Sequence, residues 1–161
     1  MNWFFIAMKK SFTLSGRARR AEFGWFSLIY LLTAIALALL ELFAQLLQSF
    51  TTAEILSVIL FIFPIITFPA QISLAVRRLH DLGYSGKWQL VIIILSTLFS
   101  IIDDKIEQAY ETNNYFLMFS SITYVLAMIS WTGWLIFKDG QPHANKYGES
   151  PKYPSETDLV V

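Results

Sequence analysis

The sequence predicts an all-α membrane protein: a four-span helical bundle with a short N-terminal interfacial helix and both termini in the cytoplasm. Three observations lead to this prediction. Hydrophobic residues make up 55% of the 161 residues and charged ones 15%, against about 45–50% and about 25% in soluble domains. Long apolar runs alternate with polar segments, as they do in spanning helices. Lysine and arginine gather in alternate polar segments, which is the distribution that sets membrane orientation.

The N-terminal segment 1–14 combines large apolar side chains with Lys9 and Lys10. This composition is typical of a helix that lies in the membrane interface. A helix packed on the protein's own surface is the alternative that the sequence leaves open. Arg17, Arg19 and Arg20 follow just before the first apolar run, where anionic lipid headgroups would lie.

Four apolar runs within a single domain, 1–151, are the predicted spans. A span needs about 20 apolar residues, and the third run is shorter, so a re-entrant segment remains an alternative there. The second run contains two prolines, which spanning helices tolerate because neighbouring groups satisfy the freed carbonyls. We expect 152–161 to be a disordered tail. The predicted spans are about 23–44, 55–76, 88–102 and 115–137.

The distribution of basic residues predicts the orientation. In a four-span arrangement, eleven of the twelve Lys and Arg residues fall on one side of the membrane, and only Lys105 falls on the other. The positive-inside rule assigns the basic side, with both termini, to the cytoplasm. Three spans would put the tail on the opposite side and spoil this asymmetry.

The polar segment 77–88, between the second and third runs, holds two arginines, a lysine, a histidine and an aspartate. The predicted topology brings it to the same membrane face as 16–22 and 139–151. Arginine side chains form bidentate hydrogen bonds with phosphates and carboxylates. We therefore predict a basic cytoplasmic face that binds anionic lipid headgroups or a protein partner. The candidate ligand-binding residues are Arg17, Arg19, Arg20, Glu22, Arg77, Arg78, His80, Asp81, Gly83, Ser85, Gly86, Asn145, Tyr147 and Gly148.

A purely structural role for these residues is the main alternative, in which the arginines fix orientation and pair with the chain's own acids. His80 beside Asp81 resembles a general base with its orienting carboxylate. Adjacent helical residues do not face each other, however, and a role in capping the helix is favoured. Gly83 and Gly86 bracket a turn that predicts positive φ values.

The sequence favours a binding protein over an enzyme, and we name no catalytic residue and expect no cofactor. The chain has no cysteine and no histidine pair with zinc-like spacing, so we predict no metal site. One alternative is a small membrane enzyme acting on a phosphate-bearing lipid or nucleotide. Another is an oligomeric transporter or channel subunit, against which stands the lack of charged residues inside the spans apart from Glu41, near the end of the first. The sequence leaves open whether the protein forms a homo-oligomer, and we expect no nucleic-acid partner.

Three motifs resemble one known family. Residues 12–23, FTLSGRARRAEF, are similar to the F-x-G-R-x-x-R-x-E-[FY]-W opening of a bacterial inner-membrane family catalogued as domain of unknown function 805. Residues 77–88, RRLHDLGYSGKW, resemble its RRLHD-x-G-x-SGWW loop, and 145–151, NKYGESP, its N-x-[YF]-G-x-x-P ending. Gly24 and Lys87 stand where the family often has tryptophan. The resemblance implies a multi-pass protein of the bacterial cytoplasmic (inner) membrane and supplies no activity.

Overall fold

The computed structural model describes residues 3–101 and 115–153, and this part of the chain is helical without any strand. The predicted all-α class is confirmed. Position 102, at the end of the third predicted span, and most of the predicted disordered tail, 154–161, lie outside the described residues. The helices of this described part are α1 (Trp3–Lys9), α2 (Arg20–Leu46), α3 (Phe50–Asp81), α4 (Lys87–Ile101) and α6 (Tyr115–Phe137).

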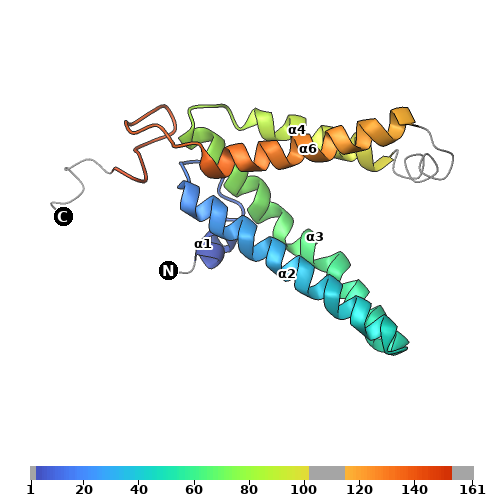
Figure 1. The fold of residues 1–161 in the computed structure, drawn as a ribbon. Coiled ribbons are helices and arrows are strands. Elements are labelled where there is room, and N and C mark those ends of the chain that lie inside the picture. Colours follow the sequence, from blue (N-terminus) through green and yellow to red (C-terminus); the bar gives the residue numbers. More distant parts are fainter. Residues whose placement is uncertain (1–2, 102–114, 154–161) are drawn as a thin grey trace.

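The four long helices form two pairs, α2 with α3 and α4 with α6, which diverge from a shared end (Figure 1). Within the second pair the contact is made by side chains. The Tyr124 hydroxyl donates a hydrogen bond to Ser96 Oγ at 3.0 Å, and its ring stacks on Phe99 with centroids 3.9 Å apart. The shared end carries the N-terminal loop, the α3–α4 connection and the C-terminal tail.

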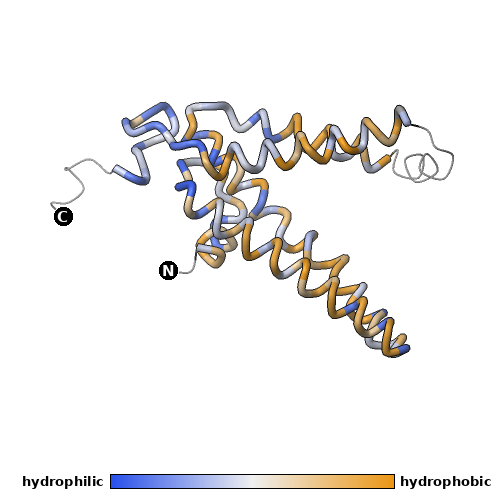
Figure 2. Tube along the Cα trace, viewed as in Figure 1, coloured by the Kyte–Doolittle hydropathy of each residue, from blue (hydrophilic) through white to orange (hydrophobic). Residues whose placement is uncertain are grey.

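Hydrophobic residues predominate along both helix pairs, while hydrophilic residues gather at the shared end (Figure 2). Many of the hydrophobic side chains are exposed. Leu39 is 60% exposed, Phe61 71% and Ile129 63%. Such surfaces are unfavourable in water and suit hydrocarbon. Within the described residues, three helices are long and apolar enough to cross a membrane: Arg20–Leu46, Phe50–Asp81 and Leu117–Phe137. The chain is therefore an integral membrane protein.

Helix α4 is shorter than the other three. Its 15 residues extend about 22 Å at 1.5 Å per residue, against about 30 Å of hydrocarbon. Helix α3, by contrast, has 32 residues and runs unbroken through Pro64 and Pro69. It passes the predicted end of the second span at Val76, so that Arg77–Asp81 forms its last turns.

The end of α3 is a Schellman motif. Gly83 adopts a φ of +86° and donates to the His80 carbonyl at 3.0 Å, while Tyr84 N–H donates to the Leu79 carbonyl at 2.9 Å. The predicted positive φ is thus confirmed at Gly83. It is wrong at Gly86, which lacks one. A side chain is excluded there for a different reason, given below.

Helix α1 packs on the rest of the protein, which is the arrangement that the sequence left as the alternative. Ala7 is fully buried, and the Phe4 ring stacks on Phe26 of α2 with centroids 5.1 Å apart. The turn after α1 is fastened by Ser73, whose Oγ lies 2.7 Å from the carbonyl oxygens of Lys10 and Thr13. The small buried core lies where α1, α2, α3 and α6 converge.

Candidate functional site

A buried carboxylate, that of Asp81 at the end of α3, is shared by two arginines. Arg17 Nε donates to Asp81 Oδ1 at 2.9 Å, and Arg78 Nη1 donates to Oδ2. The arginine side chains are each 1% exposed and that of Asp81 6%. Charges so deeply buried are tolerated only when paired and hydrogen-bonded. The three side chains therefore act as one structural unit.

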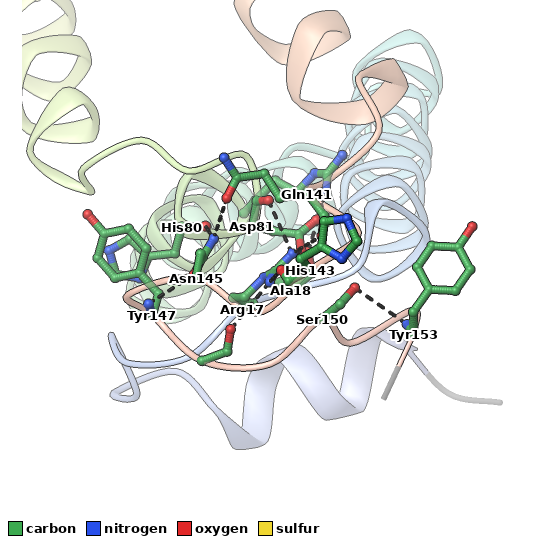
Figure 3. A network of polar contacts seen from close by, with 12 residues as sticks. Arg17, Ala18, His80, Asp81, Gln141, His143, Asn145, Tyr147, Ser150 and Tyr153 are labelled. Carbon is green, nitrogen blue, oxygen red and sulfur yellow. Dashed lines mark hydrogen bonds and ion pairs between the residues drawn. The ribbon is translucent and has the colours of Figure 1, made fainter. Parts of the chain in front are cut away.

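Arg17 also holds the C-terminal tail (Figure 3). Its Nη1 donates to the carbonyls of His143 at 2.8 Å and Gly148 at 3.3 Å, and its Nη2 donates to that of Gln141. In return, Gln141 N–H donates to the Asp81 backbone carbonyl at 2.9 Å. One guanidinium thus ties the loop before α2 to the end of α3 and to the tail.

Arg78 joins α3 to the end of α6. Its Nε donates to the Leu135 carbonyl at 2.8 Å, and its Nη2 donates to the Lys138 carbonyl. The last carbonyls of a helix lack partners within it and carry partial negative charge that favours a cation. Because α3 and α6 belong to different pairs, Arg78 connects the two pairs at the point where they diverge.

Arg77 and Glu22 form a second buried ion pair, between α3 and α2, with Nη1 and Oε1 2.9 Å apart. Ala18 N–H donates to the Arg77 backbone carbonyl at 3.1 Å. Nε and Nη2 of Arg77 are buried and have no hydrogen-bond partner among the described residues. This pair fixes the start of α2 against the last turns of α3.

His80 faces away from the carboxylate of its neighbour Asp81. Its Nδ1 lies 3.2 Å from the Gly16 carbonyl oxygen, and its ring stacks on Tyr147 with centroids 3.7 Å apart and planes within 5°. Asn145 Nδ2 donates to the His80 carbonyl at 3.0 Å. Asp81, in contrast, is engaged by the two arginines. The geometry of a histidine oriented by the adjacent carboxylate is therefore absent from this site.

Glycines let the tail and the α3–α4 connection approach closely. A Cβ at Gly140 would overlap the Asp81 carboxylate, and one at Gly83 would overlap the Gln141 amide. At Gly86 a Cβ would come within 2.6 Å of Val76 Cγ1, where real Cβ contacts essentially never occur. The close approach of Val76, and not a positive φ, thus explains why position 86 is a glycine.

A cavity of about 400 Å³ opens beside the buried cluster. Arg20 at its edge pairs with Asp139 at 2.9 Å, and Lys152 lies 3.8 Å from the same carboxylate. Arg19 also lines the cavity, is exposed, and forms no ion pair within the described part of the chain. The lining residues are Arg19, Arg20, Ala21, Arg78, Asp81, Asp139, Gly140, Pro142, Ser150, Pro151, Lys152 and Tyr153.

The structure thus brings most of the predicted residues to the shared end of the molecule. They differ there in burial and in their hydrogen-bond and ion-pair partners. Ser85 lies in the α3–α4 connection, where its Oγ accepts from the Lys87 N–H at 3.4 Å. Ligand binding by any of the predicted residues stays a prediction. Sequence reasoning missed Ser73, Gly140 and Gln141. Only the turn-rich composition around Gly140 and Gln141 could have drawn attention to that pair.

Together the fold and the cluster define a multi-pass helical membrane protein whose splayed helix pairs are joined at one end by buried arginine–carboxylate pairs. The chain belongs to the family described as protein of unknown function (DUF805), whose model matches residues 11–149. The predicted family resemblance is confirmed.

Two curated relatives are similar along nearly the whole chain. They are the inner membrane protein YhaI of Escherichia coli strain K12 and that of Escherichia coli O157:H7. Each is 27% identical over 157 residues, covering 96% of this chain and 99% of the relative. No solved structure matches. The predicted localisation is confirmed: this is a multi-pass protein of the inner membrane.

Proposed function

We propose that the protein crosses the inner membrane four times, with both termini in the cytoplasm, and binds the phosphate of an anionic lipid headgroup in the cavity lined by Arg19, Arg20 and Lys152. The observation that carries the proposal is the position of Arg19. It is an exposed cation on a cavity of about 400 Å³, and no acid in the described residues neutralises it.

The arginines differ in burial and in ion pairing, and this difference supports the assignment. Arg17 and Arg78 are buried and share the Asp81 carboxylate, so their roles are structural. Arg20 and Lys152 remain half exposed, at 50% and 51%, and share the single acid Asp139. The open side of the cavity therefore carries more positive than negative charge, which suits an anion.

The four-span arrangement supports a lipid as the source of that anion. With the shared polar end in the cytoplasm, Arg19 and Arg20 stand at the start of the first span, at the depth of the headgroups. Basic residues next to a span attract anionic lipids of the cytoplasmic leaflet. The first backbone N–H groups of α2, which begins at Arg20, add donors for a phosphate.

The test is lipid retention by the full-length protein after gentle extraction, measured by native mass spectrometry. One variant carries Arg19→Gln and Lys152→Gln, which removes two charges from the cavity. The matched control carries Lys9→Gln and Lys10→Gln, which removes two exposed charges outside it. We expect the first variant to retain several-fold less anionic phospholipid, with zwitterionic lipid unchanged in both. Equal retention in the two variants would overturn the proposal and direct the search to a protein partner.

A further inference from the structure

A second cavity, of about 480 Å³, lies where the two helix pairs diverge, and all four long helices line it. Gly24 comes from α2, Leu74 from α3, Ile92 from α4 and Trp131 from α6. The volume is within the roughly 300–1,000 Å³ of small-molecule sites. Leu135, whose carbonyl accepts the bond from Arg78, also lines this cavity. The cavity therefore begins at the layer where the pairs are joined and lies on its apolar side.

One polar atom in this lining lacks a partner. Gln89 lines the cavity, and its Oε1 is buried without a hydrogen-bond donor in the part of the chain that the structure describes. The other amide in the lining, that of Gln71, is engaged within its own helix, because its Nε2 donates to Thr67 Oγ1 at 3.1 Å. A buried acceptor left unpaired is unfavourable. A ligand that supplies a donor would remove that cost.

The rest of the lining sets the chemistry of such a ligand. Among the described residues it contains no lysine, arginine, histidine, aspartate or glutamate, so it offers no countercharge to a phosphate or carboxylate. Most of the lining is aliphatic or aromatic. The lining extends along α6 from Ile136 to Met128, about 12 Å at 1.5 Å per residue. An apolar chain aligned with the spans would match this shape.

Gln89 fixes the orientation. It is the third residue of α4 and thus lies near the polar end that the two pairs share. A head group at Gln89 would sit close to the membrane interface, and the chain would run towards the membrane centre past Ile92 and Met128. We propose that this cavity binds an uncharged amphiphile with one apolar chain, whose hydroxyl or amide N–H donates to Gln89 Oε1. This proposal does not depend on headgroup binding at Arg19.

The test uses two photoreactive probes with the same medium-length alkyl chain, which carries a diazirine near its apolar end. The polar end of one probe is a hydroxyl, and that of the other is a methyl ether, which cannot donate a hydrogen bond. Full-length protein in vesicles of zwitterionic lipid is irradiated, and labelled peptides are identified by mass spectrometry. We expect the hydroxyl probe to label the Ile92 and Met128 regions about three to ten times more than the ether, the range that one hydrogen bond supports.

Variants separate the cavity from bulk lipid. Ser27→Phe places a ring in the lining and should abolish the preference, whereas Ser130→Phe, on the exposed face of α6, should keep it. Gln89→Leu should equalise the two probes, and Gln89→Glu, which retains an acceptor, should not. Helical circular dichroism confirms folding of each variant. Equal labelling by the two probes in the wild type, or a preference that survives Ser27→Phe, would overturn the proposal.

Discussion

Arg78 on α3 donates from its Nε to the backbone carbonyl of Leu135 on α6 at 2.8 Å, although the two residues are 57 positions apart in the sequence. The same guanidinium donates to Asp81. One buried side chain therefore neutralises a carboxylate on its own helix and fastens the second helix pair to the first. Beyond this point the two helix pairs diverge, so the polar shared end provides many of the contacts between them.

Asp81→Asn should be strongly destabilising. The substitution leaves two buried guanidiniums without a countercharge, and breaking a buried pair in this way costs about 3–5 kcal/mol. The midpoint of thermal unfolding in detergent, followed by tryptophan fluorescence, measures the effect. Asp139→Asn is the control, because that side chain is 63% exposed and its pairs are worth at most about 1 kcal/mol. Similar shifts for the two variants would contradict the assigned role of Asp81.

Arg78→Lys should loosen α6 while keeping the charge. A lysine lacks the planar fork that reaches Asp81 and the Leu135 carbonyl together. Loss of one charge-assisted hydrogen bond costs about 2 kcal/mol, and amide hydrogen exchange should rise near 134–138. Arg20→Lys, in an exposed pair, should leave the exchange there unchanged. If Arg78→Lys exchanged like the wild type, a point charge would suffice at this position.

The sequence predicts the helical spans of this arrangement better than the pairs of side chains within it. The apolar run 115–137 coincides with α6, because length and hydropathy are local properties that a span must have. The gathering of three polar segments at one end follows from the alternation of spans and loops. Which side chains pair within that end could not be foreseen, since Arg17 and Asp81 are 64 positions apart and no local property of the sequence links them.

Gly83→Ala should destabilise the end of α3 for two reasons. The φ of +86° costs an L-residue about 1–2 kcal/mol, and the new methyl group would overlap the Gln141 amide. Gly133→Ala is the comparison, since that glycine lies within α6 and a Cβ there meets nothing within 4 Å. Alanine in a helix interior gains up to about 1 kcal/mol over glycine. Unfolding midpoints should therefore move in opposite directions, and a shared direction would argue against the turn geometry.

Tyr147→Ala should loosen the tail where it packs on the end of α3. The parallel stack of Tyr147 on His80 is worth about 0.5–1.5 kcal/mol beyond its buried area. Limited proteolysis of the protein in vesicles should then cut within 139–150 faster than in the wild type. Tyr147→Phe keeps the ring and should retain the wild-type rate. Faster cleavage in both variants would shift the role from the ring to the hydroxyl.

Single-cysteine labelling should resolve the number of spans, because the natural chain has no cysteine to interfere. Leu47→Cys lies between α2 and α3 and Ile101→Cys at the last residue of α4; both native side chains are well exposed, at 64% and 72%. Four spans predict that a membrane-impermeant maleimide added outside intact cells reaches both. Lys146→Cys, in the tail, should react only after the membrane is opened. If Leu47→Cys reacts from outside but Ile101→Cys stays protected, α4 re-enters without crossing. The contacts of Arg17 and Arg78 keep the end of α6 and the tail beside the end of α3, so α6 would not cross either, and Lys146→Cys would still react only after the membrane is opened. Reaction of both Leu47→Cys and Lys146→Cys from outside would contradict these contacts, because the membrane would then separate the tail from the start of α2.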